Sequence, residues 1–464
     1  MKRVLVLILL AALISSTFPT IAIALTPSAG AACSKIGQTV KYSNKKFTCI
    51  KLGKRLVWDK GVALKNPVVT TPTPSPISTP TPSPTPTPTV TTLPTPISTS
   101  TAKPSPAPFK AIIPIPLPVI QNKTITFADA VSKYAQIPQV AWQNIQDTIA
   151  ANSAVDIPTT IVIGPNTDTT IEQITNALKK EYRLWSGFAQ PISYAGLVYN
   201  AKDESWAETE WPKMAARLNL TNNPSVWIPN HLRAGCNFDN GVATECYGGM
   251  ALTFAGTDAG FAFYGVQSPY WSQSSFQSGP FSQVTHEYLH NVQMAQWNGF
   301  TLPSGIVLRS QIAHNSYPCW FSEGQANAIG IPVVSNDLDS YIRGRDNSIR
   351  RKINQNMPVK PSLSDNGLTA DAIGSFLYNQ DPATCYNPDT NGDYQLGYNI
   401  GYAATEVLVA IGGPQSTMAL LGETASGMTW AEAFQAVYGI TWKEASVILG
   451  KVLAAEYSTK PMDH

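Results

Sequence analysis

The decisive stretch of this sequence is V-T-H-E-Y-L-H-N-V-Q, residues 284–293. Its apolar residues recur at a spacing that predicts a helix, at Val284, Leu289 and Val292. His286 and His290 are four residues apart and would lie on one face of that helix, one turn from each other. Both imidazoles can then bind one Zn²⁺ at about 2.0–2.1 Å. Glu287, next to the first histidine, is placed to take a proton from a zinc-bound water.

A zinc site that catalyses hydrolysis needs a third protein ligand and one open position for water. The candidate is Glu323, which follows His290 by 33 residues in W-F-S-E-G-Q-A-N-A, residues 320–328. The apolar pattern there predicts a second helix, whose carboxylate would complete a His₂Glu site. The alternative is an acid near a helix N-terminus that interacts with the helix dipole. Gly324 and Ala326 would let a partner helix approach closely, which favours the ligand interpretation.

The pair of motifs H-E-x-x-H and W-x-x-E-G-x-A resembles the gluzincin branch of zinc metallopeptidases, over roughly residues 160–460. The resemblance implies that His286, His290 and Glu323 bind zinc and that Glu287 is the catalytic base. Many members carry an acid four residues after the ligand glutamate, where it orients a zinc-binding histidine. Here that position is Asn327, whose amide accepts a hydrogen bond but supplies no charge.

The family also uses a downstream Tyr or His to stabilise the oxyanion of the tetrahedral intermediate. The segment Y-Q-L-G-Y-N-I-G-Y offers Tyr394, Tyr398 and Tyr402, and we expect Tyr398 to take this role. The alternative for each is packing in the core. Aminopeptidase relatives carry a G-x-M-x-N segment with an acid that binds the substrate's amino terminus. Residues 248–252, G-G-M-A-L, lack both the acid and the Asn, which favours internal cleavage of a peptide paired with the strand at 250–254.

The pattern of apolar residues predicts an α+β fold with a mixed sheet first and helices afterwards, with the active-site helix between these two lobes. We expect the following helices and strands in the first lobe: helices at 128–151, 170–188 and 204–218, and strands at 159–163, 192–199, 250–254 and 260–264. From Ser282 onward the sequence predicts almost only helices. Residues 121–464 would form this zinc metallopeptidase-like domain.

The first residues resemble an export signal, with Lys2 and Arg3 before an apolar stretch and an Ala-x-Ala site at 22–24. Cleavage there removes residues 1–24, and a second small-residue site would extend the signal to residue 31. The alternatives are an uncleaved anchor and a lipid-modified Cys33. The preferred interpretation is a secreted protein, either free outside the cell or associated with the cell wall.

Residues 33–65 form a small basic unit with short β-like runs separated by turn signals. Nine Lys and Arg residues against Asp59 alone give this unit a charge of +8. It could bind an anionic cell-wall polymer or a membrane surface, or it could simply be a stable module with a solvated face. Residues 66–120 are rich in Pro, Thr and Ser, and they predict an extended linker because proline lacks the N–H that helices and sheets need.

Six cysteines suit an oxidising compartment, and proximity along the chain suggests the pairs Cys33–Cys49, Cys236–Cys246 and Cys319–Cys385. No C-x-x-C motif indicates a cysteine metal site. The net charge of +2 gives no reason to expect nucleic-acid binding. Residues 389–393, D-T-N-G-D, place oxygen ligands at alternate positions, as calcium loops do, but an ordinary turn is preferred because later ligand positions are missing.

The leading hypothesis is therefore a secreted zinc endopeptidase. One alternative is a non-catalytic surface protein that binds its partner on a metallopeptidase fold. A second alternative is a zinc amidase that acts on a cell-wall component. The sequence leaves the substrate, the cleavage preference and the oligomeric state open.

Overall fold

The computed structural model describes residues 35–42, 45–52, 55–60, 62–63, 124–217, 236–246, 249–253, 258–266, 281–298, 313, 316–350, 363, 368–379 and 396–459. The chain divides into two units, residues 1–101 and 102–464. The predicted signal at 1–24 and linker at 66–120 lie outside the described residues. Among the helices described, none is long and apolar enough to cross a membrane.

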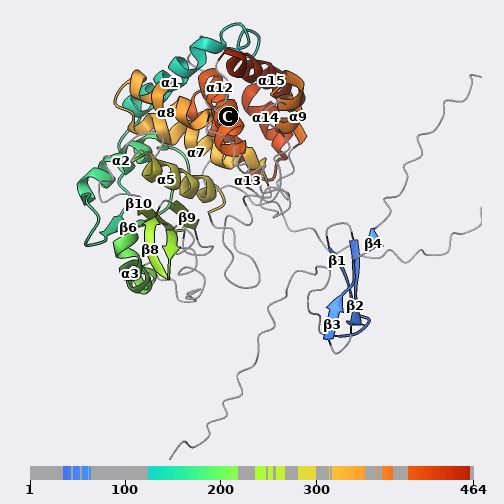
Figure 1. Ribbon diagram of the computed structural model, residues 1–464. Helices are drawn as coiled ribbons and strands as arrows, with labels where there is room; N and C mark the ends of the chain where they lie inside the picture. Colours follow the sequence, from blue (N-terminus) through green and yellow to red (C-terminus); the bar gives the residue numbers. More distant parts are fainter. Residues whose placement is uncertain are drawn as a thin grey trace, which may run out of the picture. The chain divides into compact units, whose positions relative to one another are not determined.

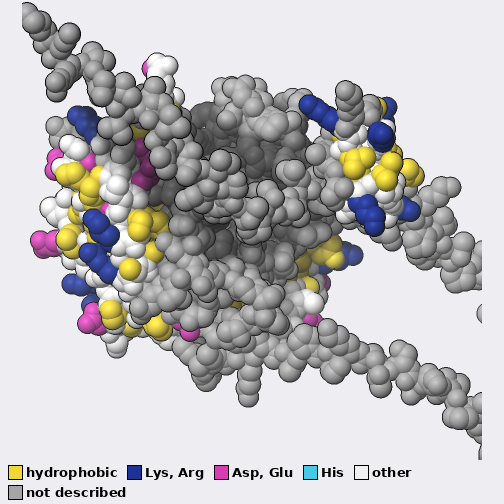
Figure 2. All heavy atoms as spheres, turned by 90° about the horizontal axis from the view of Figure 1, so that it is seen from below, with side chains coloured by type: hydrophobic (Ala, Val, Ile, Leu, Met, Phe, Trp, Pro, Cys, Tyr) yellow, Lys and Arg dark blue, Asp and Glu magenta, His cyan; other side chains and the backbone are white. Residues whose placement is uncertain are grey.

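The N-terminal unit is a small antiparallel sheet (Figure 1) with strand order β1-β2-β3, in which β4 also pairs with β2. Its strands are β1 (Thr39–Tyr42), β2 (Lys45–Leu52), β3 (Arg55–Trp58) and β4 (Val62–Ala63). Phe47, Cys49 and Trp58 form its core. Figure 2 shows Lys and Arg side chains beside hydrophobic ones on this unit. The exposed hydrophobic residues are Ile36, Ile50, Leu52 and Val62.

The large unit contains a mixed four-stranded sheet with strand order β5-β6-β10-β9. Its strands are β5 (Thr159–Ile163), β6 (Tyr194–Asn200), β10 (Gly260–Val266) and β9 (Gly249–Thr253). β5, β6 and β10 run parallel, and β9 pairs antiparallel with β10 at one edge. Every residue of β6 and β10 is buried, as expected for strands covered on both faces.

Alternate side chains of the two central strands enter two different cores, because successive residues of a strand point to opposite faces. Leu197 and Phe263 pack with Trp211 of α3 (Glu204–Arg217), which covers one face of the sheet. Val198 and Ala262 belong to the main core on the other face, together with residues of α2 (Ile171–Leu184) and α5 (Ser282–Ala295).

The region from residue 282 onward is mainly helical, and the predicted α+β fold is confirmed (Figure 1). Its further helices are α7 (Cys319–Val334), α8 (Leu338–Ile349), α9 (Ala370–Asn379), the π-helical turn η5 (Gly397–Gly401), α12 (Tyr402–Gly412), α13 (Pro414–Ala425), α14 (Trp430–Tyr438) and α15 (Trp442–Thr459). An aromatic cluster in its core includes Trp320, Phe321, Trp430 and Trp442.

The first helix begins later than predicted, because α1 spans Ile137–Ala151 rather than 128–151. Pro138 occupies its first turn, where the missing N–H of proline would have no partner within the helix in any case. The preceding residues form turns and the short 3₁₀ helix η1 (Tyr134–Gln136). In the turn before η1, the carboxylate of Asp129 accepts hydrogen bonds from Thr126.

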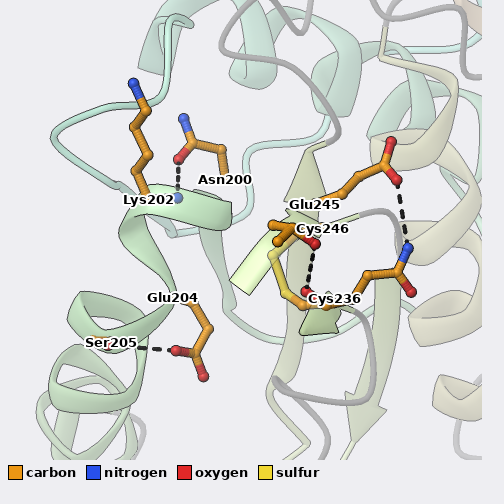
Figure 3. The surroundings of a disulfide bond; sticks show 9 residues. Asn200, Lys202, Glu204, Ser205, Cys236, Glu245 and Cys246 are labelled. Atoms are coloured by element: carbon orange, nitrogen blue, oxygen red, sulfur yellow. Dashed lines mark hydrogen bonds between the residues drawn. A yellow bond between two sulfur atoms is a disulfide. The ribbon is translucent and has the colours of Figure 1, made fainter. Parts of the chain in front are cut away.

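The predicted disulfide between Cys236 and Cys246 is confirmed, and Figure 3 shows it joining the ends of a β-hairpin. Its strands are β7 (Cys236–Asp239) and β8 (Val242–Cys246). The turn between them is Asn240-Gly241, with φ of 49° and 81°, and positive φ at both positions is what a tight hairpin turn requires. Cys49 and Cys319 are also disulfide-bonded, whereas Cys33 and Cys385 of the predicted pairs lie outside the described residues.

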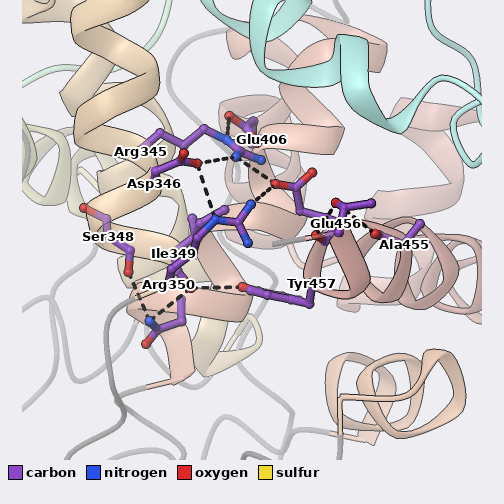
Figure 4. Close-up of polar contacts among 11 residues, drawn as sticks. Arg345, Asp346, Ser348, Ile349, Arg350, Glu406, Ala455, Glu456 and Tyr457 are labelled. Carbon is purple, nitrogen blue, oxygen red and sulfur yellow. Dashed lines mark hydrogen bonds and ion pairs between the residues drawn. The ribbon is translucent and has the colours of Figure 1, made fainter. Parts of the chain in front are cut away.

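A buried cluster of charged residues joins three helices of the helical region (Figure 4). Arg345 of α8 donates from Nε to both carboxylate oxygens of Glu406 of α12, at 2.7 and 2.8 Å. Its Nη1 donates to Glu456 of α15 at 3.0 Å. Arg350 also donates to Glu456. The charges are thus compensated inside the protein, which fixes the spacing of α8, α12 and α15.

Candidate metal centre

The helix α5 carries the H-E-x-x-H motif and is almost completely buried. Asn291, which directly follows the second histidine of the motif, anchors the helix to the sheet. Its Oδ1 accepts hydrogen bonds from Thr253 of β9 at 2.9 Å and from the Phe261 N–H of β10 at 3.2 Å, and its Nδ2 donates to the Phe261 carbonyl at 3.3 Å. A polar side chain on this otherwise packed face therefore sets how α5 lies on the two strands.

The helices α5 and α7 are in close backbone contact at Gly330. A Cβ added at this glycine would lie 2.9 Å from the backbone nitrogen of His286. Thr285 donates a hydrogen bond of 2.7 Å to the Gly330 carbonyl at the same crossing. The absence of a side chain at position 330 therefore brings the two helices, and with them the predicted ligands, within reach of each other.

The structure brings together the three predicted ligands, His286, His290 and Glu323. The two imidazole Nε2 atoms are 3.1 Å apart, and Glu323 Oε2 lies 3.2 Å from His286 Nε2 and 3.3 Å from His290 Nε2. Three ligands in a tetrahedral zinc site, each about 2.0–2.1 Å from the ion, are separated from one another by about 3.3–3.4 Å. The triangle therefore has the donor atoms and very nearly the size that zinc requires.

Each imidazole has its other nitrogen next to an amide oxygen. His286 Nδ1 lies 3.0 Å from Asn327 Oδ1, and His290 Nδ1 lies 2.8 Å from Gln293 Oε1. An amide oxygen only accepts hydrogen bonds, so each Nδ1 carries the proton. With one proton on Nδ1, Nε2 is the nitrogen of each histidine that faces the centre of the triangle and that binds a metal when it is deprotonated.

In the metal-free protein the three groups form a charged cluster. Burial opposes a charge on His290, but the carboxylate of Glu323 outweighs it and raises the pKa of His290 to about 9. Burial likewise opposes the charge on Glu323, but His290 and His286 together hold the pKa of this carboxyl well below its ordinary value. A cation at the centre of the triangle would take the place of the proton on His290.

Glu287 is buried beside the triangle and contacts the edge strand β9. The Ala251 N–H donates a hydrogen bond to its carboxylate. Gly249 lies against the same carboxylate, so closely that a Cβ at this position would overlap it. Burial is the largest effect on the pKa of Glu287 and raises it, while the two imidazoles partly offset this increase. A carboxyl group with a raised pKa is a stronger base, as general-base catalysis near neutral pH requires.

Tyr398 lies next to the triangle, on the π-helical turn η5. Its ring is stacked on His286, with centroids 6.1 Å apart and planes 9° from parallel. Two glycines bring η5 against α7, because a Cβ at Gly401 or at Gly324 would overlap the backbone of the other segment. The close helix approach predicted at Gly324 thus occurs, and its partner is the segment that carries Tyr398.

Tyr402, another tyrosine considered from the sequence, is not part of the triangle. Tyr402 is fully buried beside Glu406 and Tyr341, so its role is in the core. Tyr394, Gly248 and the segment 389–393 considered for calcium lie outside the described residues. Sequence reasoning missed Asn291 and Gln293, although both are polar residues in a helix whose neighbours are apolar, which is a usable signal of buried hydrogen bonding.

Comparisons of the chain with protein-family models, with curated proteins and with solved structures gave no match. The site is therefore interpreted from its own geometry.

Proposed function

We propose that this protein is a secreted zinc-dependent peptidase of the gluzincin type that cleaves peptide bonds internally. One observation carries the proposal: three ligand atoms of His286, His290 and Glu323 lie 3.1–3.3 Å apart, with the buried carboxylate of Glu287 on the same helix. A zinc ion bound there would act as a Lewis acid, activating water and polarising the substrate carbonyl. Glu287 would take the proton from the attacking water and pass it to the leaving amine.

The position of strand β9 at the edge of the sheet favours a peptide as the substrate. It pairs with β10 on one side, and no other described strand pairs with it. Because the carboxylate of Glu287 accepts a hydrogen bond from the backbone of Ala251 in this strand, an extended peptide added along β9 would run past the carboxylate that acts as base. Main-chain hydrogen bonds of this kind hold the interior of a peptide rather than its end, which suits an endopeptidase.

Tyr398 would stabilise the oxyanion that forms when water attacks the peptide carbonyl. Its ring is stacked on the ligand His286 and half-buried, so the side chain belongs to the rim of the site. A phenolic O–H donates a hydrogen bond to a developing negative charge at little cost in reorganisation, because the ring is held by packing.

The N-terminal unit would hold the enzyme to an anionic cell-wall polymer. Exposed basic residues support this partner, namely Lys35, Lys46, Lys51, Arg55 and Lys60. Aliphatic side chains such as Leu52 and Val62 are exposed on the same unit and would add apolar contacts. The disulfides suit an oxidising, extracellular location.

The test compares wild-type protein with Glu287→Gln and Glu323→Ala. We expect the wild-type protein to bind one zinc ion per chain and to hydrolyse casein, with loss of hydrolysis on chelation. Glu287→Gln should retain zinc and lose hydrolysis, because an amide cannot act as the base. Glu323→Ala should lose zinc, because only the two imidazoles would remain as ligands. Metal analysis and release of peptide fragments measure the two properties separately.

Glu181→Gln is the matched control, since Glu181 is another buried glutamate of the large unit. Burial raises its pKa to about 8, so it is largely protonated at pH 7 and an amide reproduces its shape and charge. The hydrogen bond of 2.6 Å that its Oε2 accepts from Trp185 can be kept by the amide oxygen. Hydrolysis of casein by Glu287→Gln at the rate of this control would falsify the assignment of the base.

A further inference from the structure

A continuous chain of side-chain hydrogen bonds leads from the ligand His290 into the protein core. His290 Nδ1 lies 2.8 Å from Gln293 Oε1, Gln293 Nε2 lies 2.8 Å from Gln325 Oε1, and Gln325 Nε2 lies 2.8 Å from Thr417 Oγ1. Thr417 Oγ1 in turn lies 2.7 Å from the carbonyl of Pro414. Three helices, α5, α7 and α13, contribute to this chain.

The chain has only one possible direction, and its fixed end is the Pro414 carbonyl. A carbonyl accepts, so the Thr417 hydroxyl donates to it and must use a lone pair towards Gln325. Gln325 therefore presents its NH₂ group to Thr417 and its oxygen to Gln293. By the same reasoning, Gln293 presents its NH₂ group to Gln325 and its oxygen to His290.

A second set of contacts fixes the amide of Gln293 independently. Its Nε2 also donates to the Ser322 carbonyl at 3.0 Å, and its Oε1 also lies 3.5 Å from the Ser322 hydroxyl. The carbonyl contact requires the orientation that the chain imposes, and the hydroxyl contact is compatible with it because a hydroxyl can donate or accept. The Gln293 oxygen facing His290 can thus only accept, and His290 must carry its proton on Nδ1.

We infer that Gln293, oriented by Gln325 and Thr417, is the positioning residue that holds His290 in the ring orientation and tautomer that bind metal. The inference rests on the metal centre of the proposed function and extends it to side chains that touch neither metal nor substrate. Gln293, Gln325 and Thr417 are all buried, so water does not replace a bond that is lost.

Only an amide fits position 293. A glutamate would place a second carboxylate oxygen against the carbonyl of Ser322 and the oxygen of Gln325, where two acceptors would repel each other. A methionine has nearly the same length as glutamine but accepts no strong hydrogen bond from the imidazole. A glutamate would still present an acceptor oxygen to His290 Nδ1, so methionine is the substitution that releases the His290 ring while leaving the imidazole itself unchanged.

The experiment measures two properties of Gln293→Met in the full chain. The first is the dissociation constant for zinc, from competition with a chelator. We expect it to rise about 10–100-fold, as is typical when the hydrogen-bond partner of a ligand histidine is removed. The second is the Nδ1 proton of His290 in the metal-free protein, measured by NMR, which should be protected from exchange in the wild-type protein and exchange rapidly in Gln293→Met. Thr417→Val should produce a smaller change in both, in the same direction.

Two matched controls separate positioning from general damage to the helices. Gln296→Met removes a buried glutamine at the C-terminal end of α5, whose Nε2 donates to the carbonyls of Ala189 and Val292. Thr424→Val removes a buried threonine of α13 that bonds to the Leu421 carbonyl, as Thr417 does to Pro414. Both controls should keep wild-type zinc affinity and the His290 proton.

Wild-type zinc affinity and a protected His290 proton in Gln293→Met would overturn the inference, as would equal losses in Gln296→Met. A wild-type protein that binds no zinc would refute the proposed function instead. The NMR readout would still decide whether Gln293 orients His290.

Discussion

The close approach of α5 and α7 at Gly330 predicts that Gly330→Ala weakens zinc binding without unfolding the protein. The added Cβ would lie 2.9 Å from the His286 backbone nitrogen, whereas ordinary contact begins at 3.4 Å. The helices must therefore separate by about 0.5 Å, because backbone atoms cannot rotate away as a side chain can. Metal–ligand distances tolerate only about 0.2 Å, so Glu323 would leave the range in which it can share an ion with the histidines.

The effect on stability should be small, since two terms oppose each other. Alanine is about 1 kcal/mol better than glycine within a helix, whereas overpacking costs about 1–3 kcal/mol. We therefore expect a net loss of about 0–2 kcal/mol, but a rise of at least about tenfold in the zinc dissociation constant. Chelator competition measures the second quantity and urea unfolding of the metal-free protein the first.

Gly374→Ala is the control for this substitution. Gly374 lies in α9, where a Cβ would be 3.1 Å from the Ser446 carbonyl oxygen of α15, so that packing is similarly tight but involves no metal ligand. It should leave zinc affinity unchanged. Unchanged zinc affinity in Gly330→Ala would refute the reasoning, because the crossing of α5 and α7 would then not determine the geometry of the ligand triangle.

Two further predictions concern charge. Because the pKa of His290 is about 9 in the metal-free protein, one proton must leave before zinc binds. The apparent dissociation constant for zinc should therefore fall about tenfold for each unit by which pH rises from 6 to 8. Chelator competition at each pH measures this constant, and a constant that does not change with pH would contradict the role of His290 as a ligand. Glu406→Gln should lower the free energy of unfolding in urea by about 3 kcal/mol, because it leaves the charge of Arg345 partly uncompensated in the interior, and zinc affinity should stay unchanged. A loss below about 1 kcal/mol would show that the charged cluster does not stabilise the fold.

Local patterns in the sequence were sufficient for most of the secondary structure. The period of a helix places His286 and His290 on one face whatever the rest of the chain does. The hairpin of β7 and β8 was not predicted, although Asn-Gly is a dipeptide typical of tight hairpin turns. The predicted start of α1 was nine residues too early, because apolar residues at helical spacing continue on the N-terminal side of Pro138, where the chain forms turns and η1 instead.

Glu323 was predicted as the third ligand from its place in a second helical pattern and from the resemblance of two short motifs to a known family, and the structure places it beside the histidines. No periodicity relates residues 33 positions apart, so their meeting depends on how α5 and α7 pack. That packing is set by Gly330 and by the hydrogen bond from Thr285 to the Gly330 carbonyl, and neither residue is distinctive in the sequence. Asn327 was identified from its position four residues after Glu323, and its Oδ1 does accept a hydrogen bond from His286 Nδ1.

By itself, the sequence determined what depends on neighbours a few residues apart: the helix with two imidazoles on one face, the base beside them, and the pairing of Cys236 with Cys246. Only the tertiary structure decided which distant groups complete them. The contacts of Gln293 with Gln325 and of Gln325 with Thr417 span 32 and 92 residues of the chain. Hydrogen bonds over such separations follow from the packing of whole helices, which no local pattern specifies.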